Sequence, residues 1–182
     1  TETNTVFTYD SAIGVYKVTI DGTEFGVGTY KDFETISLSE ATYFKADNIN
    51  VKNGQTIDGA GYTLNIKGAG GTWDSGINTT GGIIRNITVT GSFRGIFINH
   101  NGDAGKVYLE NVVVDGTIYT ISCDQGLYQG IEATNCTFNG WTSFAKTAGE
   151  AKFVNCSFGA GSGYKYCRPY SNTEFVNCTF CE

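Results

Sequence analysis

Apolar and polar residues alternate in short runs along this chain, and one six-residue phrase recurs five times. The phrase begins with an apolar residue and a variable one, continues with Asn, and ends three residues later in a large apolar side chain. Its asparagines are 25, 24, 20 and 22 positions apart: Asn86, Asn111, Asn135, Asn155 and Asn177. Because a repeat of this length cannot bury its apolar face alone, the spacing predicts a solenoid of stacked coils.

The residues after each repeat Asn alternate between two faces, as short parallel strands require. Cys136, Cys156 and Cys178 follow the Asn where earlier repeats have Ile87 and Val112, which predicts an interior column of reduced thiols. The residue two positions after each repeat Asn is expected to face outward, which gives a second column: Thr88, Val113, Thr137, Ser157 and Thr179. At the first coil we expect Leu64 and Ile66 to stack on Ile87 and Val89.

The repeat Asn is predicted to turn the corner of each coil. A corner of one or two residues needs a left-handed conformation, which Asn tolerates best after Gly. Its amide can also bond the Asn of the next coil, which predicts a structural ladder along the axis. Asn78 and four of the repeat asparagines lie in Asn-x-Thr/Ser sequons, but a glycan at each corner would break the ladder.

Residues 1–46 lack the phrase and are predicted to be an N-terminal cap or attachment segment. The runs 5–9 and 14–20 alternate like strands. A short helix is expected over 37–46, with Ser37 as N-cap and Glu40 completing a capping box. The repeated part, residues 47–182, forms the second predicted unit.

The stretch Thr56-Ile57-Asp58-Gly59-Ala60-Gly61 and the Asn-Cys-Thr-Phe pieces resemble the right-handed parallel β-helix, or pectin-lyase-like, superfamily. That group includes pectate lyases, polygalacturonases, phage tailspikes and many bacterial surface proteins without known activity. The resemblance covers residues 47–182 and implies an all-β, right-handed parallel β-helix of about five or six coils. It is specific for the fold and not for function, because one scaffold hosts many activities.

Composition and net charge disfavour two classes of binding partner. The net charge of -6 and a pI near 4.7 disfavour nucleic acid and anionic membranes. No run approaches the ~18 apolar residues of a membrane span. The chain has no Met, which indicates a processed mature chain or an excised segment. We therefore expect a location outside the cell, or on a cell or virion surface.

The sequence offers only weak catalytic candidates. The Asn-Thr-Asp, Asp-Asp, Gly-His-Gly and Arg-Ile-Lys pieces of the family's polygalacturonases are absent. The best polar cluster contains Arg94, His100 and Asp124, with Asn99 and Asp124 expected to stack on neighbouring coils. We expect no cofactor and no metal site.

Aromatic residues near the corners are the other candidates. Seven rings lie near corners or outside the inward columns: Trp73, Tyr119, Tyr128, Trp141, Tyr164, Tyr166 and Tyr170. Tyr119, Trp141 and Tyr166 are the leading candidates to stack on sugar rings, and the shielding of glycine-rich corners is the alternative. The leading hypothesis is a non-enzymatic extracellular structural or adhesive β-helix that forms a head-to-tail filament or a side-by-side trimer. The alternative is a fragment that binds or cleaves carbohydrate, of tailspike or polysaccharide-lyase type.

Overall fold

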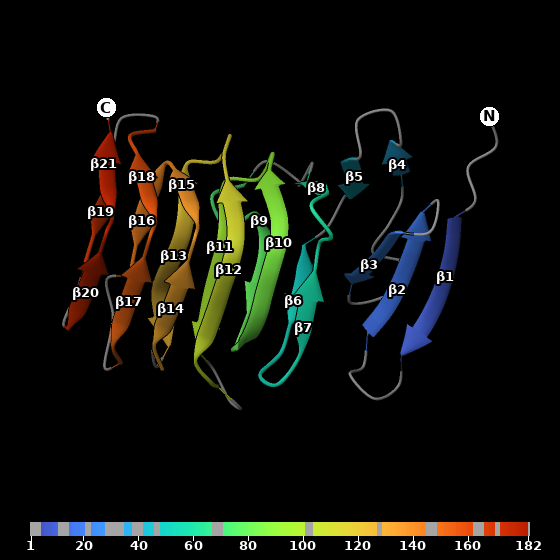
Figure 1. Cartoon of the computed structure of the whole chain (residues 1–182), viewed down its shortest axis with the longest axis horizontal. Helices are drawn as coiled ribbons and strands as arrows, with labels where there is room; N and C mark the ends of the chain where they lie inside the picture. Colours follow the sequence, from blue (N-terminus) through green and yellow to red (C-terminus); the bar gives the residue numbers. More distant parts are fainter. Residues whose placement is uncertain are drawn as a thin grey trace.

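Stacked parallel strands make up most of this protein, which forms a β-solenoid of about five turns (Figure 1). The computed structural model describes residues 5–10, 15–20, 23–27, 35–37, 42–45, 48–66, 71–100, 104–126, 129–144, 149–161, 166–169 and 172–181. Every regular element within these residues is a β-strand. None of them forms an apolar helix of bilayer-spanning length.

Twelve strands form the larger sheet. Its main path runs from one end of the solenoid to the other through β20 (Thr173–Val176), β17 (Ala151–Val154), β14 (Ile131–Thr134), β12 (Val107–Val114), β10 (Gly82–Thr90), β8 (Thr63–Ile66), β5 (Thr42–Lys45) and β4 (Thr35–Ser37). Four short strands extend it beside this path: β7 (Thr56–Asp58), β15 (Thr137–Asn139), β18 (Ser157–Gly159) and β21 (Thr179–Cys181).

Six strands form the second sheet, which closes the other side of each coil. Their order is β19 (Cys167–Arg168), β16 (Trp141–Ser143), β13 (Tyr119–Gly126), β11 (Arg94–His100), β9 (Ser75–Thr79) and β6 (Ile49–Val51). All pairs in this sheet are parallel. The chain therefore alternates between the two sheets as it advances along the axis.

The N-terminal part adds a separate antiparallel sheet of β1 (Thr5–Asp10), β2 (Val15–Ile20) and β3 (Thr23–Val27). The helix expected over 37–46 is wrong, because β4 and β5 pair as antiparallel strands there. β5 also pairs in parallel with β8. The capping-box pattern is a local signal, and sheet pairing with the first coil prevails over it.

The register places like residues on top of one another. Thr88 pairs with Val113, Val113 with Thr137, and the outward column continues in register to the last coil. The expected start of the interior column is wrong: Leu64 pairs with Val89 and not with Ile87. The turn after β7 shifts the register. Four residues, 59–62, connect Asp58 to Thr63, whereas only two, 86 and 87, connect their partners Arg85 and Thr88 on the next coil.

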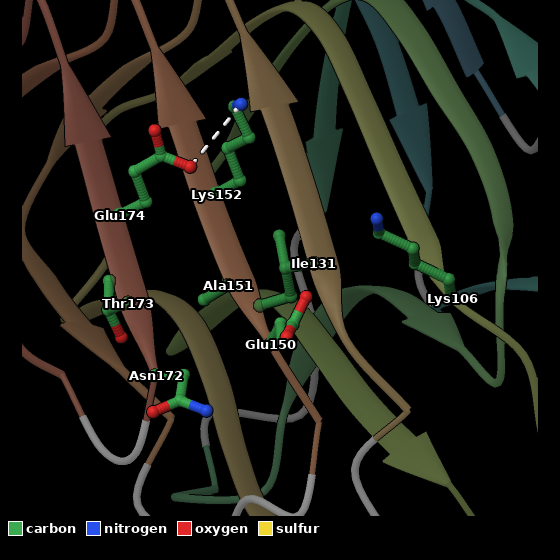
Figure 2. Close-up of a pocket in the computed structure, with 8 residues that line it drawn as sticks. All are labelled: Lys106, Ile131, Glu150, Ala151, Lys152, Asn172, Thr173 and Glu174. Atoms are coloured by element: carbon green, nitrogen blue, oxygen red, sulfur yellow. Dashed lines mark ion pairs between the residues drawn. The ribbon is translucent and has the colours of Figure 1, made fainter.

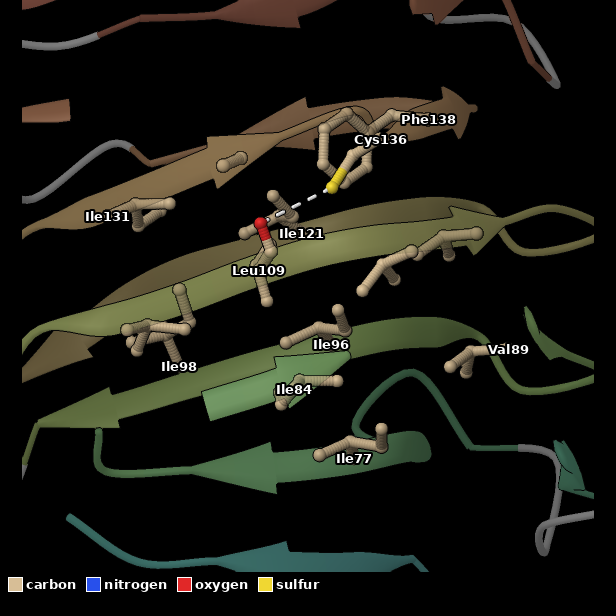
Figure 3. Packing of buried hydrophobic residues seen from close by; sticks show 14 of the residues in the cluster. Ile77, Ile84, Val89, Ile96, Ile98, Leu109, Ile121, Ile131, Cys136 and Phe138 are labelled. Atoms are coloured by element: carbon tan, nitrogen blue, oxygen red, sulfur yellow. Dashed lines mark hydrogen bonds between the residues drawn. The ribbon is translucent and has the colours of Figure 1, made fainter. Parts of the chain in front are cut away.

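The core is a continuous apolar column between the sheets (Figure 3). Aliphatic side chains fill its first coils, where Ile84 and Leu109 are fully buried. Rings fill its last coils, where Phe138, Phe153 and Phe158 pack with centroids 5.2–6.0 Å apart. Apolar burial contributes roughly 25 cal/mol per Å² and provides the main stabilisation of such a stack.

Candidate functional site: the outer face of the six-stranded sheet

Each repeat asparagine lies at a corner with left-handed backbone. The φ angles of Asn86, Asn111, Asn135, Asn155 and Asn177 are 53°, 54°, 55°, 53° and 50°. The amide of Asn111 donates to Asn86 Oδ1 at 3.0 Å, and that of Asn155 donates to Asn135 Oδ1 at 3.3 Å. These contacts join neighbouring coils at the surface.

The interior thiols lie just inside those corners. Cys136 and Cys156 are buried and Cys178 is partly buried. Cys136 donates to the carbonyl of Thr134 at 3.3 Å, and a hydrogen bond with Cys156 together with burial raises the pKa of the Cys136 thiol. All six cysteines lie within the described residues and all are free thiols.

The residues of the candidate catalytic cluster do not pair across strands in the way that the sequence predicted. Asn99 pairs with Gln125 and not with Asp124. One residue separates Phe97 from Asn99 on β11, whereas two residues separate their partners, Ser122 and Gln125, on β13. The backbone of His100 pairs with that of Gly126. The side chains of His100 and Asp124 lie outside the described set.

Arg94 is held between aromatic rings. Its guanidinium carbon lies 4.6 Å from the centroid of Trp73 and 4.5 Å from that of Tyr119. Nε donates to the Thr72 carbonyl at 2.8 Å and Nη1 donates to Ser122 Oγ. Only 6% of Arg94 is exposed. Its cation therefore orders the neighbouring rings.

Trp73 is the most exposed of these rings, with 57% of its surface accessible. Phe97 supports it edge to face, with a centroid distance of 6.1 Å. Phe97 itself faces outward, because it pairs with Asn78 and Ser122 in the outward column of this sheet. Trp73 is thus an exposed ring that Arg94 and Phe97 hold in place.

The three aromatic candidates occupy different surroundings. Tyr119 stacks on Arg94, and Trp141 pairs with Tyr119 on the next strand, 6.0 Å from the guanidinium of Arg168. Tyr166 lies apart, packed against the core and edge to face with Phe180. Tyr119 and Trp141 therefore share a face with Trp73, and Tyr166 does not.

A depression of about 200 Å³ lies further along the same sheet. Asn50 and Asn78 are cross-strand neighbours on it, and Lys52, Thr80 and Asn99 line it as well. Asn78 also pairs with Phe97, whose ring supports Trp73. Amide groups and an exposed indole therefore occupy one continuous outer face.

A second depression, of about 350 Å³, lies on the twelve-stranded sheet and is lined by charged residues (Figure 2). Lys152 pairs with Glu174 at 3.3 Å, and Lys106 pairs with Glu132 at 2.8 Å. The hydrogen bond to Glu132 raises the pKa of Lys106. Each of these exposed ion pairs contributes roughly 0–1 kcal/mol to the stability of the fold. Each lysine is thus paired with a glutamate of the protein itself.

Sequence reasoning missed the amide of Asn50 and did not place the amides of Asn78 and Asn99 beside it. It named Trp73 as one aromatic candidate among several, without the support from Arg94 and Phe97. None of them lies in the repeated phrase, and their alignment depends on the pairing of β6, β9 and β11. Asn78 carried one signal, its sequon, which marked it as a surface residue.

The described residues contain no group of three His, Cys, Asp or Glu side chains arranged to hold a metal ion. The chain matches no protein-family model, no curated protein and no solved structure. The stacked parallel coils are therefore shown by the structure, which agrees with the spacing of the Asn repeat.

Proposed function

We propose that this protein is a non-enzymatic structural and adhesive module of a cell or virion surface, and that it binds glycans on the outer face of its six-stranded sheet. We also propose, from the sequence resemblance, that the solenoid is a right-handed β-helix of the pectin-lyase-like superfamily. The observation that carries the proposal is the exposed, supported indole of Trp73.

An indole of this kind suits the apolar face of a sugar ring. Aromatic side chains contribute large contact areas, and a ring that is already ordered loses little conformational entropy when a ligand binds. Arg94 and Phe97 supply that order for Trp73. The polar depression beyond Phe97 offers hydrogen bonds to the same ligand.

The position of Arg94 favours adhesion over cleavage. Its guanidinium is buried, hydrogen-bonded to Thr72 and Ser122, and covered by rings, which suits a structural cation better than a base or a charge clamp. Carbohydrate cleavage is the alternative, and Asp124 is its remaining candidate.

A glycan array probed with the purified protein tests the proposal. We expect selective binding that Trp73→Ala reduces at least tenfold. Tyr108→Ala, which removes an exposed ring from the twelve-stranded sheet, should leave binding unchanged. Equal binding by Trp73→Ala and the wild type would overturn the assignment of this face.

A parallel assay follows the release of reducing ends and unsaturated sugars from acidic polysaccharides, with and without Ca²⁺. We expect no turnover. Turnover that Asp124→Ala abolishes would replace the adhesive function with the enzymatic one.

End-on assembly is a second candidate function, favoured by the last described coil. Phe180 is 45% exposed on β21, at the edge of the twelve-stranded sheet. A strand edge with an apolar residue is a template for pairing with another chain. We propose that the N-terminal end of a second copy docks there. Such a contact is heterologous, so it propagates into an open filament unless the rotation between copies closes a ring.

Light scattering and negative-stain microscopy across a concentration series test this assembly. We expect growth with concentration, which Phe180→Lys and deletion of residues 1–10 both suppress. A persistent monomer, a closed trimer, or assembly that survives the deletion would overturn the head-to-tail arrangement.

A further inference from the structure

The depression on the six-stranded sheet is rich in hydrogen-bond donors. Its lining includes Asn50, Asn78, Asn99, Thr80 and Lys52. An amide offers both an acceptor oxygen and two N–H donors, so its orientation decides which of them a ligand meets.

Neighbouring side chains fix two of these orientations. Asn48 Nδ2 donates to Asn50 Oδ1 at 3.1 Å, and Ser75 Oγ donates to Asn78 Oδ1 at 2.8 Å. Both amide oxygens are therefore engaged within the protein. The N–H groups are what Asn50 and Asn78 offer to a ligand.

The remaining acceptors are turned inward or occupied. Asn99 Oδ1 is buried and accepts no hydrogen bond within the described residues, so the surface of the depression does not present it to a ligand. Thr80 Oγ1 accepts a hydrogen bond from the backbone N–H of Asn53 at 3.3 Å. Lys52 supplies donors only.

We propose that this depression binds the acetamido group of an N-acetylhexosamine unit in a glycan that stacks on Trp73. This inference rests on the proposed adhesive function. A set of donors selects a ligand rich in acceptors, and a carbonyl left without a donor in a binding site weakens affinity. The acetamido carbonyl is a strong neutral acceptor that plain hexoses lack.

Charge decides between a neutral and an anionic acceptor. A carboxylate would also suit the donors, but the chain has a net charge of -6, and this charge opposes the approach of an acidic polymer. Only Lys52 brings a positive charge to the lining of the depression. The neutral acetamido sugar avoids that repulsion.

Isothermal titration calorimetry with three probes of similar length tests the inference. The probes are tri-N-acetylchitotriose, cellotriose and tri-galacturonate. Tri-N-acetylchitotriose and cellotriose share a linkage and differ at the acetamido position. We expect tri-N-acetylchitotriose to bind about tenfold or more tighter than cellotriose, which corresponds to one or two hydrogen bonds, and tri-galacturonate to bind weakest.

Asn78→Asp is the matched variant. It keeps the acceptor for Ser75, and with it the local fold, and removes the two N–H donors. We expect it to erase most of the preference for tri-N-acetylchitotriose. Asn172→Asp makes the same change in the charged depression on the other sheet and should leave the preference intact.

The outcomes separate the inference from the function. Equal affinity for cellotriose, tighter binding of tri-galacturonate, or a preference that survives Asn78→Asp would overturn the acetamido assignment and leave glycan adhesion in place. Failure of every probe to bind, together with an empty glycan array, would overturn both.

Discussion

The carboxylate of Asp58 accepts a hydrogen bond from the amide of Asn86 at 3.1 Å, at the first asparagine corner of the solenoid. Arg85 Nε donates to the same carboxylate at 2.8 Å, and the backbone N–H of Ala60 donates at 3.0 Å. Asn86 in turn accepts from Asn111. A negative charge thus ends the amide ladder at its acceptor side.

Removal of this carboxylate should destabilise the first coils. We expect Asp58→Ala to lower the free energy of unfolding by about 1–2 kcal/mol, because three hydrogen-bond donors lose their acceptor. Asp58→Asn should lower it less. Urea denaturation measures both, and Glu110→Gln, an exposed acid two strands away on β12, serves as the control. An unchanged midpoint for Asp58→Ala would show that the ladder needs no such end.

The pH dependence of that loss follows from the Asp58 pKa. Partial burial opposes ionisation, but the hydrogen bonds from Ala60, Asn86 and Arg85 outweigh it and lower the pKa. Stability from this group is therefore present above the unfolded pKa near 4 and is lost as pH falls through the lower folded value. The difference between wild type and Asp58→Asn should shrink below about pH 4.

Substitutions at Asn135 separate the backbone role of the asparagines from their side-chain role. With φ at 55°, Ala is strained there by about 1–2 kcal/mol, whereas Gly adopts the angle freely. We expect Asn135→Ala to be less stable than Asn135→Gly, the reverse of the order usual inside strands. Thermal unfolding followed by circular dichroism gives the ranking. If Ala proves the more stable, the left-handed corner is not needed.

The partly buried thiol of Cys167 predicts a loss of stability in alkali. Burial raises its pKa to about 11, with a smaller contribution from Cys178. The unfolded thiol loses its proton near pH 9 and the folded one keeps it, so the stabilisation is lost as pH rises from about 9 to 11. Cys167→Val should flatten this fall. Parallel curves for the two proteins would contradict the assignment.

The aromatic end of the core should be sensitive at Phe153 and tolerant at Phe180. Phe153 is fully buried and contacts the rings of Phe144 and Phe175, with centroids 5.7 and 5.5 Å away. We expect Phe153→Ala to lower the free energy of unfolding by about 3–5 kcal/mol. Phe180→Ala should lower it by less than half as much, because Phe180 is already 45% exposed. Similar effects in denaturant titrations would mean that the last coil is covered.

Much of the fold could be predicted from the sequence, because the Asn phrase marks equivalent positions. The residue after Asn135 and the residue after Asn155 had to lie on the same side of neighbouring coils. The first coil was misaligned because Asp58 lies outside the phrase and the turn after it has two extra residues. A count of positions cannot reveal such an insertion.

The candidate site was less predictable for a related reason. Its residues come from the six-stranded sheet, where no phrase aligns one coil with the next and β13 carries an extra residue. The expected pairing of Asn99 with Asp124 was wrong for this reason. The contact of Arg94 with Trp73 joins a strand to the loop before its neighbour, and the sequence contains no signal for it.

Fluorescence of Trp73 tests glycan adhesion on this face most directly. The chain has two tryptophans, so Trp141→Phe leaves Trp73 as the only indole. Titration of this variant with tri-N-acetylchitotriose should give a saturable change in Trp73 emission, since the sugar replaces solvent on an exposed ring. An emission spectrum that stays unchanged while calorimetry records binding would place the ligand elsewhere and contradict the glycan-binding face.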